Sequence, residues 1–556
     1  MRTKLEEDAM KSKFIQYLCL SAFALTCSLG GFANASAPSK EPQKTKTVAK
    51  KTAAPKKASV PKKAVRPVKK TVKKNTARTA LTKAKKAVVP LSAAAIPSAL
   101  ALSSGSASGT VSELPSEISH AMLRARVDKN DLSIAVIPLG SEGKKLLVNA
   151  NQPRIPASVE KIVTSAAALD LLGPSKVWST FIASEAEPEN GTLKGDLYLI
   201  GSGDPYLTIE RFWLLLDNLR ARGIKTIDGD IILDRSSFQV PAHDPFAFDG
   251  EGNRPYNLGP DALLINSRSL IIRFRPDPKK GVAYLYPEPN LEGIKLPESI
   301  PLSKEVCGAW RKQINPDYSN PYHPVFKGKY PSSCGAKNLM YTAFAQNEYV
   351  NAVFSSMWKQ MGGEWKGTVK NGKAPEERTV LASSYSDPLT KLAYNMNKYS
   401  NNLIARQLFL ALGKTAKDEP KNLASSRETM KEWAQTLKIS PRELYLDNGS
   451  GLSRNSQLSA AAAARVLEYM WNHKAMAEYM ASMPISGIDG TMKKRPVAKG
   501  QAHIKTGYIA GVRSIAGYVL TASGKRYAVA AIINGNAAIN AIPVMDAIID
   551  WVYSEC

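Results

Sequence analysis

Residues 155–174 read Ile155-Pro156-Ala157-Ser158-Val159-Glu160-Lys161-Ile162-Val163-Thr164-Ser165-Ala166-Ala167-Ala168-Leu169-Asp170-Leu171-Leu172-Gly173-Pro174. Pro156 fixes an extended entry, and Ala and Leu residues with high helix propensity follow it. Gly173-Pro174 then supplies a stop signal. The sequence therefore predicts that Ser158 lies in the first turn of a buried helix.

The spacing of Ser158 and Lys161 predicts a chemical pair. Side chains at positions i and i+3 of a helix share a face, so the lysine amine would lie close enough to take the proton of the serine hydroxyl. This Ser-x-x-Lys arrangement is a motif of serine acyl transfer. An ordinary helix start with a solvated lysine has the same spelling, so the pair alone leaves both interpretations open.

Other stretches of the chain share this spelling without its context, and two of them serve as examples. Ser59-Val60-Pro61-Lys62 lies in a low-complexity segment with a proline inside the motif, and Ser356-Met357-Trp358-Lys359 follows no helix-opening signal. We expect neither to be catalytic.

Two further polar motifs follow Ser158 and Lys161 in the chain. The first is Ser400-x-Asn402, and the second is Lys505-Thr506-Gly507, which occurs once. Ser453-Arg454-Asn455 also fits the spelling of the first motif. Ser400 is preferred because a predicted helix follows it at once and would hold its side chain on a rigid element.

The formal charge of +27 is concentrated near the N-terminus. Between Lys40 and Lys86 there are about 18 basic residues and one acid, Glu41. Lys11 and Lys13 precede an apolar run and then small residues, which predicts an export signal over residues 1–35. An uncleaved membrane anchor is the alternative, although polar residues dilute the apolar run.

Residues 36–110 are rich in Lys, Ala and Pro and are predicted to be a disordered linker. A polycation of this kind would bind anionic envelope polymers or a membrane surface, or it would serve only as a soluble spacer. No nucleic-acid partner is expected, because the basic segment lacks interleaved aromatic residues and follows an export signal.

The cysteines fit an exported protein. Cys19 and Cys27 would leave with the signal, so Cys307, Cys334 and Cys556 would remain. In an oxidising compartment we expect Cys307 to pair with Cys334 and Cys556 to stay free; three reduced thiols are the alternative. The histidines show no metal-ligand spacing, so no metal or other cofactor is expected.

Beyond residue 110 the chain predicts a catalytic domain that is split by an insert. Residues 111–180 form its first part, and residues 386–556 form its second part. Residues 181–385 contain short strand-like runs with turn-rich joins and one predicted helix, Glu210 to Arg222, which indicates inserted β-rich domains. Apolar runs at Val512 to Leu520 and Lys525 to Asn534 predict an antiparallel hairpin.

Taken in order, the three motifs make the chain resemble the class C low-molecular-mass penicillin-binding proteins, the D-alanyl-D-alanine carboxypeptidase/endopeptidase family. Further stretches carry the resemblance: residues 195–205, 447–454 and 484–491. Asn448 departs from the pattern, since many members carry Asp there. The resemblance implies an α+β fold of the penicillin-binding transpeptidase-like/serine β-lactamase-like kind, an antiparallel sheet flanked by helices, with β-rich inserted domains.

The resemblance also implies a reaction, hydrolysis of peptidoglycan stem peptides through an acyl-enzyme that β-lactams can also form. Ser158 would be the nucleophile and Lys161 its base, partly neutral because of burial and the neighbouring Lys505. Ser400 would pass a proton to the leaving amine, and Asn402 would hold a substrate amide.

Substrate binding is expected along the last motif. Lys505 and Thr506 would bind a terminal carboxylate, and Gly507 would let the peptide lie against the strand. The backbone N–H groups of Ser158 and Tyr508 would be the oxyanion donors, again by resemblance. Asp249 in the insert is a candidate to contact the diamino acid of the stem peptide, with an ordinary loop carboxylate as the alternative.

Two other functions remain open at this point. A serine β-lactamase would share the acylation machinery, but the insert and Ser400, where the class C β-lactamases carry a tyrosine, argue against it. A non-catalytic envelope-binding protein with a basic tail is the second alternative. We expect the protein to be exported and to act in the periplasm or at the cell envelope.

Overall fold

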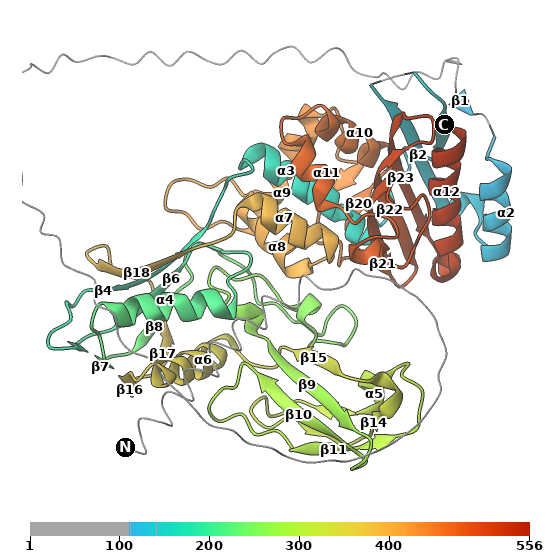
Figure 1. Ribbon diagram of the computed structural model, residues 1–556. Coiled ribbons are helices and arrows are strands. Elements are labelled where there is room, and N and C mark those ends of the chain that lie inside the picture. Colours follow the sequence, from blue (N-terminus) through green and yellow to red (C-terminus); the bar gives the residue numbers. More distant parts are fainter. Residues whose placement is uncertain (1–109, 112, 141) are drawn as a thin grey trace, which may run out of the picture. The chain divides into compact units, whose positions relative to one another are not determined.

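The computed structural model describes residues 110–556 apart from 112 and 141 (Figure 1). The predicted export signal and nearly all of the predicted linker lie outside the described residues. Within the described range, no helix combines the length and the apolar character that crossing a bilayer requires.

A six-stranded sheet in the order β1-β3-β2-β23-β22-β21 is the centre of the region that holds the three motifs. Its strands pair antiparallel except for β1 and β3, and the predicted hairpin is present as β22 and β23. The strand that carries Lys505 is at one edge of the sheet. The bounds are β1 (Thr110–Val111), β2 (Leu132–Leu139), β3 (Lys145–Val148), β21 (Ala502–Ile509), β22 (Val512–Leu520) and β23 (Arg526–Asn534).

Both faces of this sheet are covered by helices, as Figure 1 shows. Successive side chains of a strand point to opposite faces, so Ile134 and Val136 pack in one core and Ala135 and Ile137 in the other. Burial on both faces explains why β2 is apolar at every position from Ile134 to Leu139. One face is covered by α2 (Ser116–Ala125) and α12 (Ile542–Glu555). The other core includes α3 (Glu160–Leu171), α7 (Leu389–Lys398), α8 (Asn402–Ala411), α9 (Leu423–Thr436), α10 (Ala460–Trp471) and α11 (Met476–Ser482).

The middle of the chain forms two five-stranded sheets that share a separate hydrophobic core. One sheet has the order β17-β8-β6-β4-β18, from β4 (Ser179–Ser184), β6 (Leu197–Gly201), β8 (Ile231–Asp234), β17 (Val369–Asn371) and β18 (Thr379–Tyr385). The other has the order β14-β11-β10-β9-β15, from β9 (Leu270–Asp277), β10 (Val282–Glu288), β11 (Ser299–Ser303), β14 (Tyr330–Pro331) and β15 (Lys337–Tyr341).

Short strands complete the described elements of the sheets. They are β5 (Thr192–Leu193), β7 (Thr226–Ile227) and β16 (Glu364–Trp365) in one small sheet, β12 (Pro316–Asp317) with β13 (Val325–Phe326), and β19 (Leu444–Tyr445) with β20 (Gln457–Leu458).

The segment between the two catalytic parts begins and ends on neighbouring strands. β4 pairs antiparallel with β18, and the register places Ser179 opposite Tyr385. Because the chain leaves and returns at adjacent points, the intervening residues need not interrupt the packing of α3 with α7 and α8. The division at residues 180 and 385 itself stays a prediction.

The prediction of a single helix in this segment was wrong. Besides α4 (Ile209–Ala221) the segment contains α6 (Gln346–Gln360) and the short α5 (Trp310–Gln313). Ser356-x-x-Lys359, which has the same spelling as Ser158-x-x-Lys161, lies in α6, where Ser356 Oγ accepts a hydrogen bond from the Glu292 backbone at 2.7 Å. Lys359 is exposed and forms an ion pair with Glu292. Ser356 and Lys359 therefore each bind Glu292. They do not form the serine–lysine hydrogen bond that joins Ser158 to Lys161.

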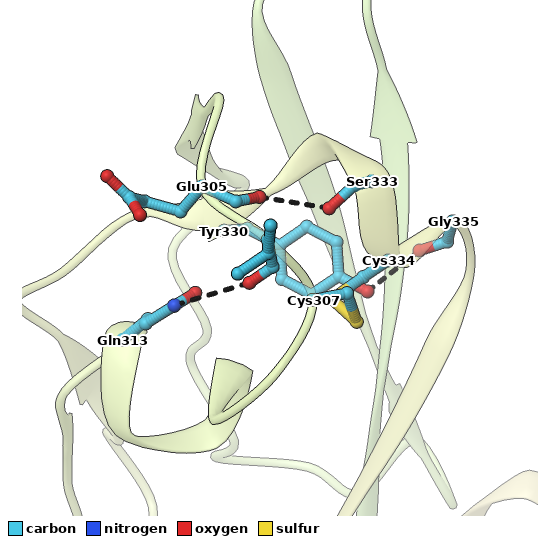
Figure 2. The surroundings of a disulfide bond; sticks show 8 residues. Glu305, Cys307, Gln313, Tyr330, Ser333, Cys334 and Gly335 are labelled. Atoms are coloured by element: carbon cyan, nitrogen blue, oxygen red, sulfur yellow. Dashed lines mark hydrogen bonds between the residues drawn. A yellow bond between two sulfur atoms is a disulfide. The ribbon is translucent and has the colours of Figure 1, made fainter.

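The predicted disulfide between Cys307 and Cys334 is present, with the two Cα atoms 4.8 Å apart. Figure 2 shows its surroundings, where the Tyr330 hydroxyl donates to the Gly335 carbonyl at 2.7 Å and Ser333 Oγ donates to the Glu305 carbonyl at 2.9 Å. Cys556 is free, as predicted. Cys334 lies in a 3₁₀ turn, η5 (Ser332–Cys334), that directly follows the edge strand β14. Trp310 of α5 belongs to the same core as Cys334.

Candidate active site

Ser158 and Lys161 are in contact where a 3₁₀ turn, η2 (Ala157–Val159), leads into α3. Lys161 Nζ lies 2.9 Å from Ser158 Oγ in a hydrogen bond, and the lysine side chain is fully buried. Ala157 has a left-handed backbone with φ of 48°, a conformation that non-glycine residues adopt only where packing fixes it. The serine therefore sits in a strained turn before the helix rather than in a regular first turn.

Two further acceptors hold the amine of Lys161. Asn402 Oδ1 accepts a hydrogen bond from Nζ at 2.8 Å, and the Ser450 carbonyl accepts another. Asn402 is the first residue of α8, which Asn401 caps by accepting from the backbone N–H groups of Leu403 and Ile404. A capped helix start thus fixes the side chain that orients the lysine.

Ser400 lies in the turn between α7 and α8 and faces the third motif. Lys505 Nζ is 3.1 Å from Ser400 Oγ and donates to the Thr506 carbonyl at 2.7 Å. Ser400 has a φ of 57°, so this serine also occupies a left-handed position. The alternative, Ser453, instead donates to the Asp447 carboxylate at 2.7 Å. The arrangement supports Ser400 as the serine of the second motif.

Gly507 allows β21 to pack against the turn that carries Ser158. A Cβ atom at this position would lie 2.8 Å from the Pro156 carbonyl oxygen and 3.1 Å from the Ser158 nitrogen. It would also lie 2.1 Å from Ser514 Oγ, which donates to the same Pro156 carbonyl. The missing side chain therefore makes room for the protein itself, a different reason from the substrate contact that the sequence suggested.

Thr506 and Tyr508 lie on the edge strand beside Ser158. Thr506 Oγ1 is 2.7 Å from Thr491 Oγ1, and the Tyr508 ring is about half exposed with the Arg513 guanidinium 4.0 Å from its centroid. Ile509 and Val512 close the hairpin, so alternation along the strand directs the Tyr508 N–H away from β22. This direction is compatible with the expected oxyanion donor.

Burial lowers the pKa of both motif lysines. For Lys161 desolvation is the main cause of a pKa well below its usual value, and the charges of Lys505 and Arg406 lower it further. For Lys505 desolvation lowers the pKa to about 7. Burial therefore favours the neutral form of Lys161, which is the direction that the sequence argument required.

Glu160 and Asn448 also contribute to this site, in roles that the sequence patterns did not predict. Desolvation raises the pKa of the fully buried Glu160 carboxyl to about 7, and its charge raises the pKa of Lys161. Asn448 Oδ1 accepts from the backbone N–H of Ser450 at 3.0 Å, and Ser450 offers its carbonyl to Lys161. A backbone acceptor has no residue signature, so sequence patterns could not identify Ser450.

A loop from the insert also reaches the site. Asn402 Nδ2 donates to the Tyr256 carbonyl at 3.2 Å, and the Tyr256 hydroxyl donates to Asp249 at 2.9 Å. Asp249 also accepts from Asn257 Nδ2 at 2.7 Å and from the Glu251 backbone at 3.0 Å. These contacts make Asp249 a loop-bracing carboxylate, which was the alternative to a substrate-reading role.

The part of the chain that the structure describes contains no cluster of three or more His, Cys, Asp or Glu side chains able to hold a metal ion. The polar groups around Ser158 are amines, hydroxyls and a carboxamide, a set suited to proton transfer and hydrogen bonding. The arrangement can activate a hydroxyl and place positive charge near a bound carboxylate.

Comparison with known proteins agrees with this chemistry. Residues 114–554 match the model of the D-Ala-D-Ala carboxypeptidase 3 (S13) family. The chain is 27% identical over 441 residues to the D-alanyl-D-alanine carboxypeptidase DacB of Haemophilus influenzae, covering 74% of this chain and 89% of the relative. It is 25% identical over 426 residues to a D-alanyl-D-alanine carboxypeptidase of an Actinomadura species, covering 71% and 76% of the two chains.

The crystal structure of penicillin binding protein 4 (dacB) from Haemophilus influenzae is similar in fold, with a TM-score of 0.65 at 24% identity. The match covers 77% of this chain and 97% of that chain. The predicted fold class and the predicted family are confirmed. This chain belongs to the D-Ala-D-Ala carboxypeptidase 3 (S13) family.

Proposed function

We propose that this protein is a serine-type D-Ala-D-Ala carboxypeptidase/endopeptidase that forms its acyl-enzyme at Ser158. The observation that carries the proposal is the 2.9 Å contact between the Ser158 hydroxyl and a fully buried amine whose pKa is lowered. A neutral amine beside a hydroxyl is suited to act as general base for nucleophilic attack. The substrate class comes from the similar proteins described above, which are D-alanyl-D-alanine carboxypeptidases.

In the acylation step, Ser158 Oγ attacks the carbonyl carbon of the penultimate D-Ala, and its proton passes to Lys161 Nζ. The backbone N–H groups of Ser158 and Tyr508 stabilise the oxyanion. The peptide bond then breaks, and Ser400 relays a proton to the leaving amine. The proton taken from Ser158 thus ends on the released residue, and an ester remains on the enzyme.

Deacylation repeats these proton transfers with water as the nucleophile. Lys161 takes a proton from the water that attacks the ester, and the proton then returns to Ser158 Oγ as the acid product leaves. A β-lactam follows the same acylation route, because opening of its ring leaves an ester on Ser158.

The groups around the edge strand β21 bind the substrate. Lys505 and Thr506 bind the terminal carboxylate, because the Lys505 amine is 3.1 Å from Ser400 Oγ and thus close to the reacting atoms. Asn402 orients Lys161 through Oδ1 and retains one donor and one acceptor position for a substrate amide.

The enzyme acts on the cell envelope in this proposal. The predicted export signal over residues 1–35 would deliver it there, and the basic linker over residues 36–110 would hold it to anionic envelope polymers or a membrane surface. Binding through the linker would weaken as the salt concentration rises.

The test is incubation of the purified full chain with cross-linked and uncross-linked muropeptides. Ser158→Ala is expected to abolish both D-Ala release and labelling by a fluorescent penicillin. Ser356→Ala is the matched control, since it removes the serine of the other described Ser-x-x-Lys spelling, and it should retain both. Activity in Ser158→Ala would show that the nucleophile is elsewhere.

Two outcomes would favour the other functions. Turnover of nitrocefin well beyond one equivalent would indicate a β-lactamase. Failure of the wild-type chain to bind fluorescent penicillin, together with no muropeptide hydrolysis, would indicate a binding protein without catalysis.

A further inference from the structure

A cavity lies in the insert, and its lining does not include the groups that contact Ser158. It has a volume of about 510 Å³ and is bounded by the segments 235–245 and 259–268. Polar lining comes from Arg235, Gln239, His243, Asp261 and Arg268. None of the residues named above as proposed catalytic groups lines it.

The charges around this cavity do not balance. Arg235 Nη1 is paired with Asp261 at 2.7 Å. Arg268 has no such partner, and its Nε atom is buried without a hydrogen bond to any described residue. One carboxylate therefore faces two guanidinium groups, which leaves a net positive charge. A buried donor without a partner is costly, so native proteins rarely retain one without a reason.

The backbone that presents Arg268 is itself strained. Asn266, Ser267 and Arg268 have φ values of 48°, 51° and 46°, three consecutive left-handed residues without a glycine. Each such residue costs on the order of 1 kcal/mol. Asn266 Nδ2 holds the turn by donating to the Tyr349 hydroxyl at 3.0 Å and to the Ser269 carbonyl at 3.1 Å. The fold thus maintains a strained turn that places an unpaired arginine at a cavity.

We propose that this cavity is a binding site for a small oxyanion, a carboxylate or a phosphate group, held by Arg268 and Arg235. A planar guanidinium matches either oxyanion with paired N–H donors. The ligand would supply the negative charge that the lining lacks. A chain of contacts connects this cavity to the active site. His243 lines the cavity, and its Nε2 donates to the Asn257 carbonyl at 2.6 Å. Asn257 is in the loop whose Tyr256 carbonyl contacts Asn402.

Titration of the full chain with inorganic phosphate, and separately with acetate, in a zwitterionic buffer tests the proposal. The melting temperature and the Kd from calorimetry are measured for the wild type, Arg268→Gln and Arg235→Gln. Arg222→Gln is the control, because it removes one exposed arginine of the same insert that does not line the cavity. Phosphate and acetate separate the two ligand chemistries, and saturable binding of either supports the site.

We expect the anion to raise the melting temperature of the wild type and of Arg222→Gln by at least about 2 °C. Arg268→Gln should weaken the Kd at least about tenfold. Without the anion it should melt no lower than the wild type, because the lost guanidinium forms no ion pair with the described residues and its buried Nε donates no hydrogen bond to them. Absence of saturable binding by the wild type would overturn the proposal. So would an unchanged Kd in Arg268→Gln. Neither result depends on catalysis at Ser158.

Discussion

The region around Ser158 and the insert use charge in opposite ways. Near Ser158, the side chains of Glu160, Lys161 and Lys505 are fully buried, although burial disfavours the charged form of each. In the insert, ion pairs such as Lys359 with Glu292 are largely exposed. Exposed pairs of this kind contribute little to stability, and the insert also has an apolar core and a disulfide.

The aromatic cluster around Phe274 illustrates this second kind of packing. Trp310, Phe326 and Tyr330 surround Phe274 with ring centroids 5.7, 5.5 and 5.1 Å away. Such packing stabilises the fold and performs no chemistry. The difference teaches that the region around Ser158 accepts a stability cost for several buried charged groups close together, whereas this part of the insert packs apolar rings. Variants of each region should therefore separate stability from activity.

The largest expected effect comes from removing the proposed nucleophile. Ser158→Ala should lower the acylation rate by fluorescent penicillin by at least about 10⁴-fold, because the variant lacks the hydroxyl that forms the ester. Its melting temperature should change little, since the serine is partly exposed and loses one hydrogen bond. A stopped-flow labelling assay beside a thermal melt checks both, and residual acylation above this level would contradict the assignment.

Removing the disulfide tests the insert. The double variant Cys307→Ser/Cys334→Ser should lose about 3 kcal/mol of unfolding free energy, because the bond closes a loop with a sequence separation of 27 residues. The acylation rate below the unfolding temperature should stay within about twofold of wild type. Denaturant unfolding measures the first quantity and penicillin labelling the second. A large loss of acylation in a folded double variant would break the separation between the regions.

Lys505→Met should stabilise the protein by about 2 kcal/mol at neutral pH while impairing acylation. The pKa of Lys505 falls from 10.5 in the unfolded chain to about 7 when folded, so the unfolded state binds the extra proton between these values. The buried Lys505 therefore lowers the free energy of unfolding of the wild type by the full amount below about pH 7. This loss becomes smaller as the pH rises toward 10.5. Unfolding free energies measured at pH 7 and at pH 10 should show that Lys505→Met is stabilised over the wild type by less at pH 10. A variant that is less stable than wild type at pH 7 would be evidence against a costly buried amine.

The smallest effect is expected from Glu160→Gln. The charge of Glu160 raises the pKa of Lys161, so removing it should let the lysine lose its proton at lower pH. The acid limb of the acylation rate should then move down by about one pH unit or less. Glu292→Gln is the control, an exposed acid of the insert. An acid limb that stays in place or moves to higher pH would exclude this coupling.

Much of the fold could be predicted because its elements carry local signals. The hairpin of β22 and β23 and the capped start of α8 follow directly from residue patterns. Helix α6 was missed because its first flanking residue, Ala345, has no side chain that could cap the helix. The helix is also rich in residues such as Tyr349, Val353 and Trp358, which favour strands. Tertiary packing against the core of the insert overrides these weak preferences.

The site could be predicted in part for a similar reason. Ser158 and Lys161 are one turn apart, so spacing alone placed them together. The carbonyls of Ser450 and Tyr256 contribute only backbone atoms, and Tyr256 meets Asn402 across 146 residues of sequence. Such long-range backbone contacts leave no trace in local patterns.

Peptide mapping of the protein after reaction with penicillin tests the central claim most directly. Mass spectrometry of the digested adduct should locate one penicilloyl group on Ser158, and Lys161→Met should form that adduct at least about 10³-fold more slowly. An adduct on Ser400 or on any other residue, or normal acylation in Lys161→Met, would contradict the claim that the buried amine activates Ser158.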